Sequence, residues 1–345
     1  MVAGFGRGPI APLFALLAAC GSTGSGPTTP SGPPAPPPGP HFTVSPLPVE
    51  AIARITPVGF NNKIFPTPHT YWQLCDDFFI LQSNRPCRLE RMPIRAPMAA
   101  VVRSLNPTDD GFIEFEGLPG LHFHFGHVTP APDLSVGSRV TAGQVVTTMF
   151  QTNGVDFGLR NYGVRHRYVV PTRYHDAYLH AEHPIAQFPE PLRSQLMTKL
   201  NSLSVAPLGR LSYDVEGTAS GGWFLEGAPS SALQVGNERF LLWLARYVER
   251  DETRILSIGE RWPGMQNQVV AVDPSAPDWE SITPASGTVV MKLWNLSAQA
   301  LPNAAGPPAG TFLIRLLAPN RLRMEWFETH APVSDFTAAA KVFER

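Results

Sequence analysis

The sequence predicts a mainly β (all-β) protein with two folded units. Short apolar runs alternate with proline, glycine, asparagine and aspartate along most of the chain, and runs bounded in this way are typical of strands. The chain has 37 prolines and 29 glycines, whereas charged residues make up only 16% of it. Hydrophobic residues reach 43%, which is enough for packed cores, and 345 residues are enough for two domains.

Charge and motifs exclude two classes of partner. The 27 basic and 28 acidic side chains give a net charge of −1, so no broad positive field attracts a phosphate backbone. The sequence also lacks a G-x-G-x-x-G motif, a Walker-type loop and a G-x-S-x-G elbow. We therefore expect neither a nucleic acid nor a nucleotide as ligand.

Residues 1–19 have the anatomy of a secretory signal peptide, with an apolar run that ends in Leu17-Ala-Ala-Cys20. This end resembles the lipobox of bacterial lipoproteins, which implies cleavage before Cys20 and a lipid on that residue. An ordinary signal peptide is the alternative. No other stretch is apolar and long enough to cross a bilayer, so the lipid would be the membrane anchor. Gly21 and Ser22 lack the aspartate of inner-membrane retention, which favours the outer membrane.

Residues 20–41 are predicted to be the lipidated cysteine and a tether. Residues 21–40 carry no charge and no large side chain, and the proline-rich part from Pro27 to Pro40 favours extended polyproline II. A ligand for an SH3-type domain is the alternative. Cys75 and Cys87 form an even pair in an exported chain, which predicts a disulfide, with two free buried thiols as the alternative.

The first folded unit is predicted over residues 42–204. Leu121-His-Phe-His-Phe-Gly-His-Val128 precedes Leu134-Ser-Val-Gly-Ser-Arg-Val-Thr-Ala-Gly-Gln-Val-Val146, in which two glycines mark a turn. With Ala96-Pro-Met-Ala-Ala-Val-Val102, this hairpin resembles biotinyl/lipoyl-like barrels and lysostaphin-type (LytM) metalloendopeptidases. The hairpin has no lysine for a biotin or lipoyl group, so the lysostaphin-type β barrel-sandwich is the closer match, over roughly residues 58–160.

The resemblance implies an active site from which this chain departs. Peptidases of this type hold zinc through an H-x-x-x-D motif and the second histidine of a later H-x-H, whose first histidine is the base. His69 matches the first ligand, but Gln73 replaces the carboxylate. The later motif reads Gly154-Val-Asp156, so the base is lost and Asp156 alone could coordinate. His127 falls at the active-site histidine before the hairpin and is the candidate catalytic residue.

A rearranged zinc site is chemically permissible, because three nitrogen or oxygen ligands can hold zinc. One alternative is that the histidines pack against aromatic residues and hydrogen-bond to the backbone. Another is a pocket without metal for a sugar or a peptide. The visible H-x-H lies before the hairpin, and strand periodicity would place both its imidazoles on one face. The metal candidates are His69, His127, Asp156, His122 and His124.

A second cluster of titratable residues lies later in the first folded unit, after the region that resembles the peptidases. Helical spacing would place Asp176, His180 and His183 on one face, where they could bind a metal. Prolines at 171 and 184 bound this stretch, and a solvated, histidine-rich turn is the alternative.

Residues 205–345 are predicted to form a second β-sandwich or barrel module. Short apolar runs closed by turn residues recur here, and we interpret residues 240–248, which also fit a helix, as a strand. Exposed tryptophans could stack on sugar rings, but most are expected in the core. This unit holds Trp223, Trp243, Trp262, Trp279 and Trp294.

The sequence thus predicts a lipid-anchored cell-envelope protein whose peptidase-like domain binds peptidoglycan or an envelope partner without cleaving it. The alternative is a zinc metalloendopeptidase that acts on the peptide cross-links of peptidoglycan. A third possibility is that both domains are spacers in a larger assembly.

Overall fold

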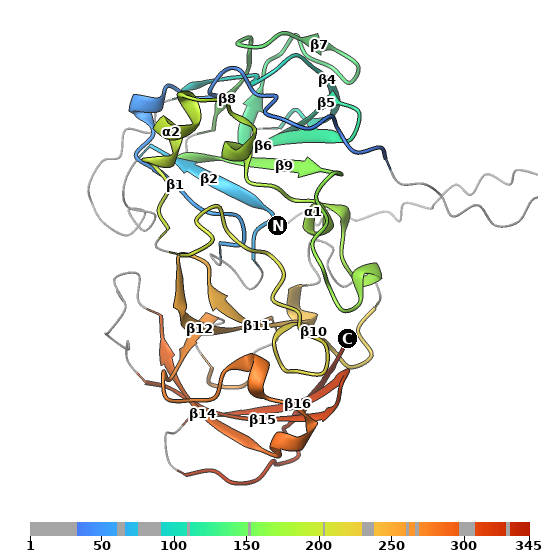
Figure 1. Cartoon of the computed structure of the whole chain (residues 1–345), viewed down its shortest axis with the longest axis vertical. Helices are drawn as coiled ribbons and strands as arrows, with labels where there is room; N and C mark the ends of the chain where they lie inside the picture. Colours follow the sequence, from blue (N-terminus) through green and yellow to red (C-terminus); the bar gives the residue numbers. More distant parts are fainter. Residues whose placement is uncertain are drawn as a thin grey trace, which may run out of the picture. The chain divides into compact units, whose positions relative to one another are not determined.

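The structure, a computed structural model, describes most of the chain after residue 32. These residues belong to one compact unit and form an open nine-stranded sheet and a closed eight-stranded barrel (Figure 1). The prediction of an all-β protein is confirmed. The predicted signal peptide, Cys20, Cys75 and Cys87 lie outside the described residues. Described are residues 33–60, 66–74, 91–108, 111–150, 153–202, 204–229, 238–259, 262–265, 269–296, 308–328 and 332–345.

The sheet has the strand order β1-β2-β9-β6-β5-β4-β7, and β8 pairs with both β3 and β6. Strands β2, β9, β6 and β5 are neighbours and antiparallel (Figure 1). The strands are β1 (Arg54–Ile55), β2 (His69–Gln73), β3 (Pro93–Arg95), β4 (Ala100–Asn106), β5 (Gly111–Leu118), β6 (Leu121–Pro130), β7 (Arg139–Val140), β8 (Val145–Met149) and β9 (Gly154–Asn161).

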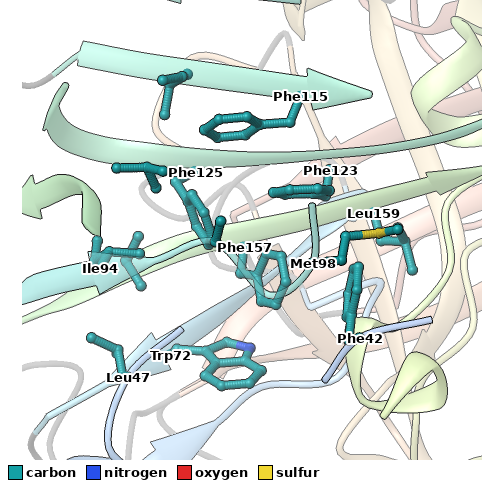
Figure 2. Close-up of a cluster of buried hydrophobic side chains, with 14 of the residues drawn as sticks. Phe42, Leu47, Trp72, Ile94, Met98, Phe115, Phe123, Phe125, Phe157 and Leu159 are labelled. Atoms are coloured by element: carbon teal, nitrogen blue, oxygen red, sulfur yellow. The ribbon is translucent and has the colours of Figure 1, made fainter. Parts of the chain in front are cut away.

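One face of this sheet is the hydrophobic core. Trp72, Phe115, Phe123, Phe125 and Phe157 are fully buried and come from four different strands. The rings of Phe115 and Phe123 stack at 4.9 Å, and those of Phe125 and Phe157 also lie 4.9 Å apart (Figure 2). Side chains of a strand alternate between its faces, so the residues between these aromatic ones belong to the opposite face.

Segments before and after the sheet complete this core. Phe42 is fully buried, and its ring lies 5.7 Å from that of Phe123 and 5.2 Å from that of Phe188. Phe188 follows the 3₁₀ turn η3 (Pro184–Gln187) and precedes helix α2 (Leu192–Met197), which buries Leu196. Further short turns are η1 (Val49–Ala51) and η2 (Pro171–Arg173), and helix α1 spans Asp176–Leu179.

The described end of the predicted tether lies against the β5–β6 turn. Residues 33–40 are mostly exposed, yet a Cβ added at Gly120 would lie 1.8 Å from the Pro34 carbonyl oxygen. Gly120 has a φ of 77°, in the left-handed region that favours glycine. Both the turn conformation and the close approach of Pro34 therefore require glycine at this position.

His183 makes folding sensitive to pH. It is 4% exposed, its Nδ1 accepts a hydrogen bond from the Ile185 N–H at 3.1 Å, and Nε2 faces the Thr56 carbonyl oxygen. Burial lowers the pKa of His183 to about 3. The unfolded chain binds a proton near its ordinary pKa of 6.5, so this contribution to stability is complete above that pH and falls as the pH drops toward 3.

We expect the free energy of unfolding to fall by about 3 kcal/mol between pH 7 and pH 4 through His183. In His183→Asn, the amide oxygen can still cap Ile185 but does not titrate in this range. Urea unfolding at both pH values, followed by circular dichroism, should therefore show a smaller pH dependence for the variant. An equal pH dependence in both proteins would contradict the assignment to His183.

Strands β10 to β17 form the closed barrel, in which each strand pairs antiparallel with its neighbours in the chain and β17 closes on β10. The predicted strand over residues 240–248 is confirmed as β11. The strands are β10 (Gly221–Leu225), β11 (Leu241–Tyr247), β12 (Arg250–Ile258), β13 (Val269–Val272), β14 (Val289–Asn295), β15 (Pro308–Ala318), β16 (Arg321–Phe327) and β17 (Lys341–Glu344), with 3₁₀ turns η4 (Glu238–Phe240), η5 (Trp279–Ser281) and η6 (Pro284–Ser286).

The barrel interior is filled with side chains. Trp223, Trp262 and Trp279 belong to one buried cluster, and Trp243 is buried in another. Four of the five tryptophans of this unit are therefore in cores, as expected.

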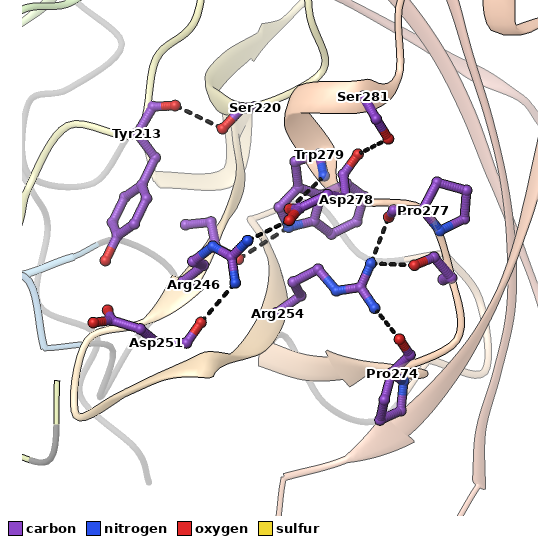
Figure 3. A network of polar contacts seen from close by, with 12 residues as sticks. Tyr213, Ser220, Arg246, Asp251, Arg254, Pro274, Pro277, Asp278, Trp279 and Ser281 are labelled. Atoms are coloured by element: carbon purple, nitrogen blue, oxygen red, sulfur yellow. Dashed lines mark hydrogen bonds and ion pairs between the residues drawn. The ribbon is translucent and has the colours of Figure 1, made fainter. Parts of the chain in front are cut away.

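A buried arginine fixes the loop that leads to η5. Arg254 is 8% exposed and donates hydrogen bonds to the carbonyl oxygens of Asp273, Pro274, Ala276 and Pro277. Figure 3 shows the bonds to Pro274 and Pro277. One guanidinium thus satisfies four backbone acceptors, for which its planar array of five N–H donors is suited.

Among the described residues, no helix is long and apolar enough to cross a membrane.

Candidate functional site

The candidate site lies on the face of the sheet opposite the core. Strand pairing places Tyr71 opposite Asp156, and Gly126 opposite Asp156 from the other side. His124 lies opposite Gly158, and His122 lies opposite Arg160. We define the polar face as the residues of β2, β9, β6 and β5 that alternate with the core: His69, Tyr71, Gln73, Gly154, Asp156, Gly158, Arg160, His122, His124, Gly126, Phe112, Glu114 and Glu116, together with the bulged residue His127.

Three predicted site residues converge on this face. Nε2 of His69 lies 3.3 Å from Oδ2 of Asp156, and Nε2 of His127 lies 3.5 Å from the same oxygen. The Asp156 side chain is 14% exposed and that of His127 is 47% exposed. Two imidazoles from separate strands therefore share one carboxylate oxygen at the edge of solvent.

A bulge brings His127 to the polar side. Strict alternation after Phe125 would point His127 into the core. The β5–β6 register shifts there, because Gly126 pairs with Phe112 and Val128 pairs with the adjacent Gly111, which leaves His127 without a position in the pairing. His127 is the extra residue and has a φ of 58°, a conformation that is uncommon outside glycine. The strand then resumes with Val128 buried in the core.

Glycines make room for the polar side chains. A Cβ at Gly158 would lie 2.0 Å from the imidazole of His124, and a Cβ at Gly126 would lie 3.3 Å from Oδ2 of Asp156. His124 therefore extends over strand β9 toward His69, and the centroids of the two rings lie 6.1 Å apart. Burial, with a smaller contribution from the charge of His69, lowers the pKa of His124 to about 4 and keeps it neutral at pH 7.

The two positions where this chain departs from the peptidase pattern are direct neighbours. Gln73 pairs with Gly154 in the β2–β9 register, and Gln73 is 1% exposed. A Cβ at Gly154 would lie 2.6 Å from the carbonyl oxygen of Trp72. A larger residue at position 154 therefore requires a shift of the backbone.

His122 belongs to a different group on the same face. Its Nδ1 lies 3.7 Å from Oε1 of Glu114, and that oxygen also accepts a hydrogen bond from the Arg160 guanidinium. Burial raises the pKa of Glu114, but the hydrogen bond with His122 and the charge of Arg160 outweigh it and hold the pKa below its usual value. The predicted placement of His122 and His124 on one face is confirmed by the pairing.

The arrangement does not match a zinc site. In the part of the chain that the structure describes, no group of three or more His, Cys, Asp or Glu side chains is placed to hold a metal ion. The buried amide of Gln73 is also a poor zinc ligand. Binding of zinc by His69, His127 and Asp156, which would require rearrangement, stays a prediction.

The second predicted cluster is not built as the helical spacing suggested. Helix α1 ends at Leu179, and His180 caps it with a φ of −126°, which interrupts the helical repeat. Asp176 accepts a hydrogen bond from the Tyr162 hydroxyl at 3.0 Å, whereas the buried His183 caps η3. These side chains therefore have separate structural partners, and the alternative of a solvated turn is wrong for His183.

Sequence reasoning missed five side chains of the polar face: Tyr71, Phe112, Glu114, Glu116 and Arg160. The sequence does contain a signal for them, because each lies next to a buried residue in its strand. Only the register shows that they share one face, and pairing between β5, β6, β9 and β2 joins segments that are distant in sequence.

Comparison with solved structures finds matches that each cover about a third of this chain. The chain is similar to Helicobacter pylori Csd3, with 16% identity over 36% of this chain and 32% of that chain and a TM-score of 0.27. It is similar to the catalytic domain of the prophage-encoded M23 protein EnpA from Enterococcus faecalis, with 20% identity over 36% of this chain and 88% of that domain and a TM-score of 0.25. The M23 metalloprotease pseudoalterin matches with 11% identity over 39% of this chain and 77% of that chain, with a TM-score of 0.27.

The chain spans about a third of the length of Csd3. No family model matches the chain, and no curated protein matches it.

Proposed function

We propose that the chain is an exported, lipid-anchored envelope protein whose sheet domain binds peptidoglycan without cleaving it. The observation that carries the proposal is the pairing of Gln73 with Gly154. The resemblance implies a carboxylate ligand at the first of these positions and a base at the second, and this chain has neither.

Hydrolysis by a zinc peptidase requires a ligand set that leaves one position open for water, and a base that takes a proton from that water. Gln73 is neutral and buried, so it does not supply the missing negative charge. Gly154 has no side chain, and the Trp72 carbonyl oxygen lies too close for one. What remains is a polar face with half-buried rings and paired charges, which suits recognition.

The lipid anchor is supported by the sequence alone. The apolar run that ends in Leu17-Ala-Ala-Cys20 and the small residues after it resemble a lipobox. Fractionation of cells that produce the full chain tests the anchor, because Cys20→Ser should move the protein from the membrane to the soluble fraction.

The alternative is a zinc metalloendopeptidase. It is favoured by one observation, that His69 and His127 both direct Nε2 to Oδ2 of Asp156, at 3.3 and 3.5 Å. If a small movement allowed these three groups to hold zinc, a position for water would remain.

The experiment that separates these functions uses the mature chain, residues 20–345 with Cys20→Ser, and purified peptidoglycan sacculi carrying a dye on their peptides. We expect the protein to sediment with the sacculi and to release no dye, with or without added zinc. The matched control is the double variant His69→Ala and His127→Ala, which removes both imidazoles that face Asp156.

Release of dye that requires zinc and is lost in the double variant would overturn the proposal in favour of the endopeptidase. Failure to sediment with sacculi would overturn peptidoglycan binding, and capture of one defined envelope protein by the immobilised chain would then identify the partner.

A further inference from the structure

A row of aromatic rings crosses the polar face. The ring of Tyr71 lies 5.1 Å from that of His69, His69 lies 6.1 Å from His124, and His124 lies 5.6 Å from Phe112. All four residues are half-buried. We call these four residues the ring row.

The fold builds this row across four strands. Tyr71 and His69 come from β2, His124 from β6 and Phe112 from β5. Strand β9 separates β2 from β6, and its residue at the crossing is Gly158. Because a Cβ at this glycine would lie 2.0 Å from the His124 ring, any larger residue there would displace that ring and interrupt the row.

The carboxylates beside the ring row all have partners. Glu116 pairs with Arg103, Glu114 with Arg160 and His122, and Asp156 with His69 and His127. These pairs leave the face with little net charge. They also leave carboxylate oxygens and guanidinium N–H groups at its rim, which can accept from and donate to hydroxyl groups.

We propose that the ring row binds the glycan strand of peptidoglycan, a neutral chain of β-linked N-acetylated amino sugars. The inference rests on the proposed function and names the part of peptidoglycan that is recognised. A pyranose ring has an apolar C–H face that packs on an aromatic ring, and hydroxyl groups at its edge for the paired charges of the rim. A nearly neutral face fits such a chain better than peptide stems that carry free carboxylates.

The rings of the row are inclined to one another. Their planes meet at 76° between Tyr71 and His69, 79° between His69 and His124 and 48° between His124 and Phe112, so sugars can pack on separate ring faces along the row and not on one flat surface.

The test measures binding of the mature chain, residues 20–345 with Cys20→Ser, to three probes by isothermal titration calorimetry. The probes are an N-acetylglucosamine hexamer, the free stem peptides, and glycan strands from which an amidase has removed the peptides and whose freed lactyl carboxyl groups have been converted to neutral methylamides. We expect the hexamer and the stripped strands to bind and the peptides not to bind.

Two variants then test the rings. Phe112→Leu and Tyr71→Leu keep an apolar side chain but remove the flat aromatic face. Each should weaken hexamer binding about tenfold, which is the effect expected for the loss of one stacked aromatic ring. The control is Phe240→Leu, which changes a half-buried phenylalanine of η4 and should leave the affinity unchanged. Each variant should unfold in urea at a midpoint close to that of the parent protein, which establishes that it folds.

The outcomes separate the two proposals. A chain that sediments with sacculi but binds neither the hexamer nor the stripped strands overturns the glycan assignment and leaves the proposed function intact. Equal hexamer affinity in the parent and in both ring variants also overturns it. A chain that binds neither sacculi nor any glycan probe overturns both.

Discussion

Replacing Phe157 with alanine is expected to lower the free energy of unfolding by about 3–5 kcal/mol. Phe157 is fully buried, and its ring lies 4.9 Å from that of Phe125, 5.3 Å from that of Trp72 and 5.8 Å from that of Phe42. Three aromatic neighbours from separate segments meet around it, so the cavity left by truncation cannot easily collapse.

Urea unfolding measures this loss, and hydrogen exchange followed by mass spectrometry locates it. Peptides from residues 111–130 of the sheet should lose protection, whereas peptides from residues 311–327 of the barrel should not. The control is Phe336→Ala, which truncates a half-exposed phenylalanine under the Arg323 guanidinium and should cost about 1 kcal/mol or less. A loss below 1 kcal/mol for Phe157→Ala would contradict the packing described here.

The second large effect is expected for Arg254→Met, at about 3–5 kcal/mol. Methionine fills a similar volume but leaves four carbonyl oxygens of the loop before η5 without their donor. Arg254→Lys should recover only a part of the loss, because an ammonium group has three donors and lacks the planar fork that reaches all four acceptors.

For Arg254 the measured quantity is again the free energy of unfolding in urea, and exchange protection should now fall in residues 250–258 and 269–272. The matched control is Arg315→Met, which changes an exposed arginine of strand β15 in the same barrel. Equal stability of the two methionine variants would show that the four hydrogen bonds contribute little.

Much of the fold could be predicted because strand patterns are local. The runs around residues 99–102, 112–115 and 145–150 became β4, β5 and β8, and alternation in β6 separated its histidines from its phenylalanines. Pairing could not be predicted in the same way, since β2 and β9 are more than 80 residues apart and their register depends on the assembled core.

In the candidate site, too, the residues that belong to sequence motifs were predicted, whereas those brought together only by strand pairing were not. His69, His127 and Asp156 were singled out by resemblance, and the structure brings them together. Glu114 and Arg160 were missed because neither belongs to a motif; their contact exists only where β5 and β9 flank β6. The bulge at His127 was also invisible, because Phe125-Gly126-His127-Val128 reads as an uninterrupted strand.

Alternation along β6 and β9 has a consequence for how such a protein can diverge. Residues such as Phe123 and Phe157 maintain the core, whereas their direct neighbours His124 and Asp156 contact only the other face. Substitutions of such side chains can therefore accumulate without loss of folding, whereas the glycines of the same face, Gly154 and Gly158, have no room for a larger residue. An insertion of one residue in β6 would exchange the two faces beyond it, unless a bulge absorbed the extra residue as it does at His127.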